Sequence, residues 1–200
     1  MSFIHLRTSS AFSLKYGTTQ PRDLVERAAQ FESPALALTD RDGLSGAIRF
    51  ASACLEFGIA PIIGVNLAID LLADPNIKST PAKDLPRVTV LAHGDGGWRA
   101  LVRLLSGLNM NAADRTPILT LDLLQRFSRY STQLHLLHGP ESPVSQALTL
   151  HRSDIALEIF NKTRPLFGDH AIDCVSHLVA GKGPFSTAHA ARSLIFARYH

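Results

Sequence analysis

Extended and helical sequence patterns alternate along the first hundred residues of this chain, and this alternation constrains the fold more than any other feature. Short apolar runs predict strands over residues 3–7, 34–39, 60–69 and 87–92. Apolar residues at helical spacing predict helices between these runs: one capped by Thr18 or Thr19, one between Ala47 and Gly58, and one over 98–108. Strands that alternate with helices are typical of βα units with a parallel sheet. The first half of the chain therefore predicts an α/β fold.

The second half of the chain is less regular. We expect helices over 120–127, 143–150, 153–166 and 186–199, and extended segments over 133–137 and 171–179. The chain has 200 residues, the size of one domain, and 46% of them are apolar, which is enough for a substantial core. The sequence stops inside a helical pattern with no strand after it. We therefore expect a single domain over residues 1–200 that is truncated at its carboxyl end.

Composition and charge exclude several classes of protein. The net charge of +3 comes from lysines and arginines spread along the chain, so weak contact with nucleic acid is permitted but not indicated. Cys54 and Cys174 lie far apart and outside any CxxC pair, which argues against a disulfide framework or a zinc knuckle. The sequence shows no signal peptide and no apolar run long enough to cross a membrane. We expect a cytoplasmic protein with no membrane partner.

Polar residues cluster where the predicted strands end, which is where barrels of parallel strands place their reacting groups. His5, Arg7 and Ser9 share one face of the first strand because side chains alternate with a period of two. The later strands contribute Asp40, Arg41, Asn66, Arg87 and the "HGPES" turn after residue 137. Arginine cannot ligate a metal ion and serine seldom does. This row is therefore a poor metal cage.

Several of these segments resemble motifs of the polymerase and histidinol phosphatase (PHP) domains of bacterial DNA polymerase III alpha subunits and error-prone DNA polymerases. The first motif usually reads His-Leu-His-x-His-Ser before a Ser-Leu turn and Gly, and residues 5–17 read "HLRTSSAFSLKYG". The second motif, Ala-Leu-Thr-Asp-His, is similar to "PALALTDRDGLSGAIRF" over 34–50, and the third, Pro-Ile-Ile-Gly-x-Glu, to "GIAPIIGVNLAI". Residues 87–106 resemble the strand and helix that follow in the polymerases. The resemblance is continuous over residues 3–106 and weaker over 120–200.

The resemblance implies a distorted TIM-like barrel of the (β/α)7 type, here without its last βα unit. Metal-binding members hold divalent ions at the strand ends for phosphoester hydrolysis. Matched by position, this sequence keeps His5 and Asp40 as residual ligand positions. It has Arg7 and Ser9 in place of motif histidines, Arg41 in place of the next histidine, Asn66 in place of the glutamate, and Arg87 where histidine is frequent. Two ligands cannot hold a cluster that needs about four donors per ion, so we expect no catalytic residue and no cofactor.

Two hypotheses concern Arg7, Arg41 and Arg87. At least one guanidinium is expected to pair with Asp40 and replace the metal as counter-charge. Alternatively, the three arginines bind a phosphate group or a nucleic-acid backbone. His135 and His138 lie three residues apart, so on a strand they face opposite sides and do not share a metal.

The resemblance further implies a role in DNA replication or translesion synthesis. We expect the amino-terminal PHP domain, or a truncated product, of a DNA polymerase III alpha-like DNA-directed DNA polymerase. This nucleotidyltransferase would carry its own active site beyond residue 200, while the chain itself would contact the polymerase core or a replisome protein. The alternatives are a free-standing phosphoesterase that uses zinc or manganese, and a remnant without function.

Overall fold

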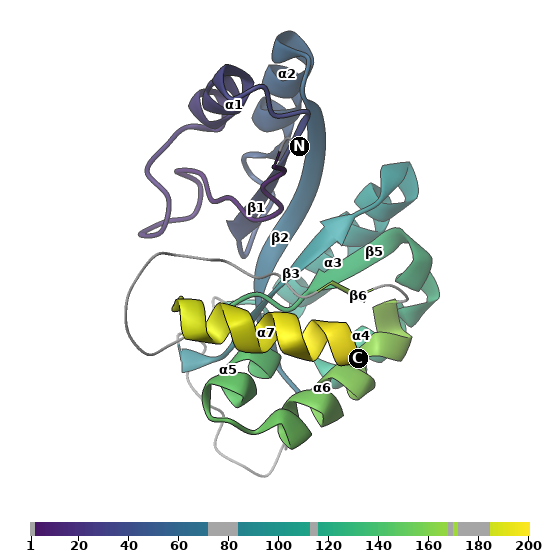
Figure 1. The fold of residues 1–200 in the computed structure, drawn as a ribbon. Coiled ribbons are helices and arrows are strands. Elements are labelled where there is room, and N and C mark those ends of the chain that lie inside the picture. Colours follow the sequence, from purple (N-terminus) through teal and green to yellow (C-terminus); the bar gives the residue numbers. More distant parts are fainter. Residues whose placement is uncertain (1–2, 72–83, 113–115, 168–169, 172–184) are drawn as a thin grey trace.

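The computed structural model describes residues 3–71, 84–112, 116–167, 170–171 and 185–200. Its centre is one sheet with the strand order β1-β2-β3-β5-β6, and β4 pairs with β2 outside this order (Figure 1). The strands are β1 (Ala35–Arg41), β2 (Ala60–Asp70), β3 (Arg87–Ala92), β4 (Ile118–Thr120), β5 (Leu134–Leu137) and β6 (His170–Ala171). The helices are α1 (Pro21–Gln30), α2 (Ala47–Phe57), α3 (Gly94–Ala112), α4 (Leu121–Phe127), the 3-10 helix η2 (Ser128–Gln133), α5 (Pro143–Thr149), α6 (Ser153–Phe167) and α7 (Thr187–Tyr199). The predicted α/β class is confirmed.

The direction of β3 differs from the prediction of a parallel sheet. β1 and β4 run parallel to β2, and β6 runs parallel to β5, but β3 is antiparallel to both β2 and β5. The sequence "RVTVLA" has the same alternation of side chains in either direction, so its pattern contains no information on orientation. Because β3 is reversed, its first residue, Arg87, lies at the end of the sheet where β1, β2 and β5 finish.

The segment before α1 was predicted to begin with a full strand, and the structure reduces that strand to a single bridge. His5 forms a parallel bridge with Leu36. Beyond it, the amide of Ala37 donates to the carbonyl of His5 at 2.9 Å and the amide of Thr39 donates to the carbonyl of Thr8 at 2.8 Å. The segment therefore runs alongside β1 toward the end of the sheet where β3 begins.

The ends of the first two helices follow local chemistry. α1 begins at Pro21, and the preceding Gln20 makes no side-chain cap, so the predicted cap at Thr18 or Thr19 is wrong. Pro21 favours the start of α1 instead, because the fixed φ of proline suits the first helical turn and its missing N–H is not needed there. α2 ends as predicted at Gly58, which adopts the left-handed conformation with φ 69°.

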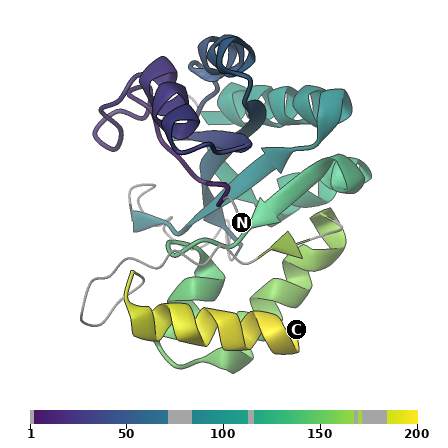
Figure 2. The same cartoon turned by 45° about the horizontal axis from the view of Figure 1, so that its top comes forward.

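The buried side chains form three clusters. The largest joins β2, β3 and β5 to α3 and α4, and it contains Leu101, Leu104 and Leu105 of α3. A second cluster joins β1 to α1 and α2, and a third joins α5, α6 and α7. In both views α1 and α2 lie at one end of the molecule, and α5, α6 and α7 gather at the other (Figures 1 and 2). Every helix in the described ranges is too short or too polar to span a bilayer.

Part of the chain lies outside the described residues. This part includes residues 72–83 between β2 and β3 and the predicted extended segment 171–179 beyond Ala171. Cys174 also lies outside them. The remaining predicted helices, over 120–127, 143–150, 153–166 and 186–199, correspond to α4, α5, α6 and α7.

Candidate functional site

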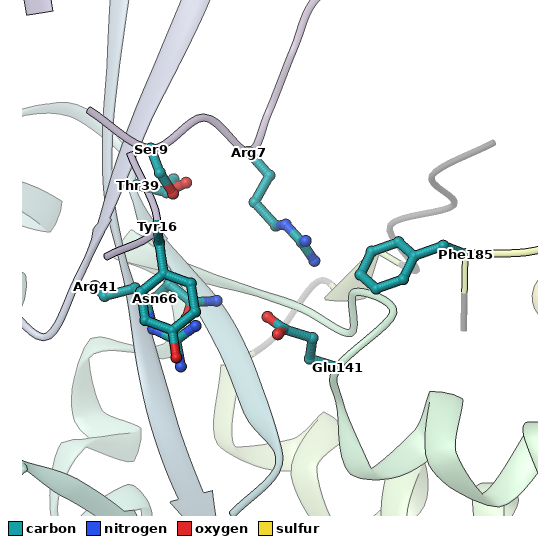
Figure 3. A pocket seen from close by; sticks show the side chains of 8 residues that line it. All are labelled: Arg7, Ser9, Tyr16, Thr39, Arg41, Asn66, Glu141 and Phe185. Carbon is teal, nitrogen blue, oxygen red and sulfur yellow. The ribbon is translucent and has the colours of Figure 1, made fainter. Parts of the chain in front are cut away.

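A cavity of about 230 Å³ opens where β1 finishes, beside Asn66 of β2 (Figure 3). Its wall is formed by the segment before α1, the sheet, the turn before α5, and Phe185 before α7. The lining residues are Arg7, Ser9, Tyr16, Thr39, Arg41, Asn66, Glu141 and Phe185. Arg7, Ser9, Arg41 and Asn66 belong to the row that the sequence predicted, so the structure brings these four together. It does not bring His5 to them.

The register of the sheet explains why these residues meet. Arg41 pairs with Asn66 across β1 and β2, and Asn66 pairs with Thr89 across β2 and β3. The reversed strand β3 places Arg87 beside this row, where its amide donates to the carbonyl of Glu141 at 2.8 Å. One sheet end thus gathers residues that are 100 positions apart in the sequence, from Arg41 to Glu141.

Arg87 is a buried guanidinium that ties two elements together. Its Nε donates to Asn66 Oδ1 at 2.5 Å, and its Nη2 donates to the Asn66 carbonyl at 2.8 Å and to Asp42 Oδ1 at 2.6 Å. The Arg87 side chain is 5% exposed and Asp42 is 29% exposed. A guanidinium is held here by one carboxylate and two amide oxygens, which satisfies a buried cation.

Asp40 is buried and accepts three hydrogen bonds. The amide of Ser10 donates to Oδ1 at 2.7 Å, the Ser10 hydroxyl to Oδ2 at 2.8 Å, and the Ser13 hydroxyl to Oδ1 at 2.7 Å. Within the described residues Asp40 makes no ion pair, so the predicted pairing of Asp40 with an arginine is wrong. The hydroxyl groups of the segment before α1 take the place expected for a guanidinium, and Arg87 pairs with Asp42 instead.

Arg41 faces the cavity and stacks on Tyr16. The Arg41 Cζ lies 3.5 Å from the centre of the Tyr16 ring, close enough for a cation–π contact (Figure 3). In the part of the chain that the structure describes, no carboxylate lies within salt-bridge distance of Arg41. Burial, and next the charge of Arg87, lower the pKa of Arg41. The cavity therefore holds a cation that its surroundings disfavour.

Arg7 and His5, which were predicted to share one face of the first strand, lie in different places. Arg7 lines the cavity and extends toward Glu141 and Phe185 (Figure 3). His5 is exposed and lies beside Leu36 at the beginning of β1, where its ring contacts Phe3 at 4.8 Å. Leu36 precedes Asp40 by four residues, which on a strand is roughly 13 Å. His5 and Asp40 are therefore not assembled into one site.

Comparison with known proteins shows the family. A family profile described as PHP domain matches residues 5–177. The chain belongs to the PHP domain family. An error-prone DNA polymerase of Mycolicibacterium paratuberculosis is 35% identical over 149 residues, which are 74% of this chain and 13% of that protein. A DNA polymerase III subunit alpha of Buchnera aphidicola is 31% identical over 169 residues, which are 82% of this chain and 14% of that protein.

The fold of this PHP domain also matches a solved structure. A crystal structure from Bifidobacterium adolescentis, provisionally described as a metal-dependent phosphoesterase, aligns with a TM-score of 0.51 and 16% identity. The alignment covers 98% of this chain and 82% of that one. At this identity the likeness concerns the fold alone, and the PHP domain spans about one seventh of the curated polymerases it matches.

The described residues at the sheet end do not fit a divalent metal cluster. No group of three or more His, Cys, Asp or Glu side chains with metal-binding geometry occurs in the described ranges. The oxygen atoms of Asp40 face the donors of Ser10 and Ser13, and Arg87 uses Asp42 and Asn66. A metal ion would have to displace donors from each of these acceptors, and the added arginines would repel it.

Sequence reasoning missed the partners of the two carboxylates. Ser10 and Ser13 lie within the quoted first motif, and their spacing of three places both in one turn, where the Ser13 amide donates to the Ser10 carbonyl at 2.9 Å. Such a turn can aim two hydroxyl groups at one acceptor, but only the fold shows that the acceptor is Asp40. The role of Tyr16 as the platform of Arg41 had no signal of its own in the sequence.

The structure separates His135 from His138, as predicted. His138 is fully buried with its Nε2 at 3.3 Å from the Thr163 hydroxyl, whereas the His135 ring contacts His93 with ring centres 5.8 Å apart.

Proposed function

We propose that this chain is the amino-terminal PHP domain, or a truncated product, of a bacterial DNA polymerase III alpha-like polymerase and that it acts by packing and interaction rather than by hydrolysis. The family match and the two polymerase relatives support the parent protein. The observation that carries the loss of hydrolysis is the buried Arg87 guanidinium bonded to Asn66 and Asp42.

This bonding pattern disfavours metal chemistry for a physical reason. A catalytic metal needs open positions and about four protein or water donors per ion. Here a fixed cation already uses oxygen atoms of Asn66 and Asp42 at the sheet end, and guanidinium cannot ligate a metal. The charge that stabilises the strand ends is thus supplied by the chain itself.

We further propose the larger architecture and surroundings. The sheet with its parallel pairs β1·β2, β2·β4 and β5·β6 would belong to a distorted TIM-like barrel of the (β/α)7 type. The partner would be a polymerase core or another replisome protein in the cytoplasm, with a role in DNA replication or translesion synthesis. The polymerase active site would lie in the parent protein outside these 200 residues.

Metal content and hydrolysis test this proposal. The purified chain is expected to contain less than about one tenth of an equivalent of zinc or manganese by elemental analysis, far below the stoichiometric metal of a catalytic site. It should hydrolyse no phosphoester when either metal is added. A variant that carries Arg7→His, Ser9→His, Arg41→His and Asn66→Glu provides the control, because it returns the residue types of the metal-binding motifs. Stoichiometric metal in the unmodified chain, with hydrolysis that a chelator abolishes, would establish the free-standing phosphoesterase instead.

The interaction role needs a separate measurement. A DNA polymerase III alpha chain deprived of its own PHP domain is mixed with this chain and analysed by size-exclusion chromatography. Co-elution is the expected result. Separate elution, together with absent hydrolysis, would favour the remnant without function.

A further inference from the structure

We propose that the cavity beside Arg41 binds a phosphate monoester or inorganic phosphate, with the Arg41 guanidinium and the Ser9 and Tyr16 hydroxyl groups as its ligands. This inference rests on the proposed function, since it requires that no metal occupies the sheet end. Arg41, which stands where the motif has a histidine, would then bind the ligand.

Arg41 supplies the attraction. The Tyr16 ring covers one face of its guanidinium at 3.5 Å and leaves the N–H groups along the guanidinium edge for a ligand. No carboxylate lies within salt-bridge distance of it in the described residues, and Glu141 and Asp42 offset its charge only in part. Since burial and Arg87 both lower the pKa of Arg41, an anion in the cavity would relieve the repulsion between the two guanidinium groups.

Two hydroxyl groups add neutral donors. Ser9 and Tyr16 both line the cavity, and neither side chain has a hydrogen bond within the residues that the structure describes. Thr39 and Asn66 also line it, but their polar atoms are engaged with Thr8 and with Arg87. A phosphate oxygen can accept from a guanidinium edge and from hydroxyl groups at once, and such charge-assisted bonds are the strong ones.

The size of the cavity favours a single phosphoryl group. Its volume of about 230 Å³ lies below the ~300–1,000 Å³ of sites that enclose drug-sized ligands. A nucleoside base would therefore have to remain outside, and the phosphate would be the recognised part. The ligand could be free phosphate or the terminal phosphate of a nucleotide or strand, which share this chemistry.

The negative charge of Glu141 would repel a bound phosphate, and this repulsion can be tested. Its carboxylate lines the same cavity, together with Arg7 and Arg41, so the lining carries two cations and one anion. Arg87 is not among the lining residues, and its pair with Asp42 at 2.6 Å offsets its charge in part. Removing the charge of Glu141 should therefore tighten phosphate binding, whereas general damage to the fold would weaken it.

Isothermal titration with inorganic phosphate, at constant ionic strength in chloride and with EDTA present, measures the site. Arg41→Gln should weaken phosphate binding at least about tenfold. The affinity of Arg41→Lys should lie between those of the unmodified chain and Arg41→Gln, and Glu141→Gln should bind phosphate more tightly. Arg99→Gln is the matched control, since it removes the same charge from the exposed face of α3 and should change nothing. Equal affinities of the Arg41→Gln and Arg99→Gln variants would overturn the proposal, as would weaker binding by Glu141→Gln.

Short oligothymidylates distinguish the two sources. A strand with a 5′-phosphate that binds more tightly than its 5′-hydroxyl counterpart supports a terminal phosphate, and binding of inorganic phosphate alone supports the free anion. Equal binding of the two strands would show backbone recognition and contradict a monoester site. Phosphate binding that disappears on adding EDTA would mean that a metal carries it, which contradicts the proposed function as well. Absence of binding with and without EDTA contradicts this inference only.

Discussion

Asp40 illustrates how one buried carboxylate fixes the position of a whole segment. Its two oxygen atoms accept from the Ser10 amide, the Ser10 hydroxyl and the Ser13 hydroxyl, and its side chain is 2% exposed. The Ser13 hydroxyl in turn accepts from the Arg41 amide at 3.0 Å. Asp40 thus adds three side-chain bonds to the backbone contacts that attach the segment carrying Ser9 and Tyr16 to β1.

Asp40→Ala should therefore destabilise the protein strongly. The substitution leaves buried donors of Ser10 and Ser13 without their acceptor, and we expect a loss of about 3 kcal/mol in the free energy of unfolding. Ser13→Ala removes one donor and should lose about half as much. Denaturation with urea, followed by circular dichroism, measures both. A loss under about 1 kcal/mol for Asp40→Ala would show that the segment is held by other contacts.

At the scale of elements, Gly64 determines how closely β2 approaches β3. A Cβ at this position would lie 2.6 Å from Leu91 Cδ2 and 2.7 Å from the Val90 carbonyl oxygen, closer than any ordinary contact. Glycine is thus the residue that fits this close approach of the two strands. Asn66, two residues later, relies on the same pairing to reach Thr89 and Arg87.

Gly64→Ala should separate the two strands and destabilise the fold by about 2 kcal/mol, because the obstructing atom of Val90 belongs to the backbone. Gly107→Ala is the matched control in α3, where a Cβ would meet nothing within 4 Å. Alanine at a helix interior is favoured over glycine, so this variant should gain about 0.5–1 kcal/mol. Thermal and urea unfolding of the two variants should shift in opposite directions; a common direction would refute the steric argument.

The elements also show what the sequence could and could not predict. Periodic burial is a local property, so the positions of α2, β2 and α3 could be predicted from spacing alone. Strand direction depends on the partner, and the reversal of β3 changed which residues Arg87 meets. The predicted row of His5, Arg7 and Ser9 assumed a full strand, and the single bridge at His5 lets the chain carry only the latter two residues to the cavity.

At the scale of the whole molecule, the cavity depends on parts that belong to different hydrophobic clusters. Arg41 extends from the strand β1 of the second cluster, while Phe185 precedes α7, which belongs to the third. α7 packs through Phe196, whose ring centre lies 6.0 Å from that of Phe160 on α6. Movement of α7 would therefore displace one wall of the cavity.

A buried histidine makes the packing of α7 sensitive to pH. His189 Nδ1 lies 3.2 Å from the Thr149 hydroxyl on α5, and its Nε2 lies 3.2 Å from the Ser193 hydroxyl. Burial, and next the charge of Arg192, lower the pKa of His189 from its ordinary value of 6.5. The neutral ring is thus the form that fits between α5 and α7.

Acidification should loosen α7 before it affects the sheet. Because the pKa of His189 is lower in the folded state, the unfolded segment binds a proton first as the pH falls through 6.5, and the stability that the neutral ring provides is lost below that pH. Hydrogen exchange measured at pH 7.5 and 5.5, after correction for the intrinsic rate, should show a selective loss of protection in α7 compared with β2. His189→Gln should remove this difference between the two pH values, whereas His93→Gln, at an exposed position, should leave it intact. If α7 and β2 lose protection together, the third cluster does not open separately and the protein unfolds as one cooperative unit.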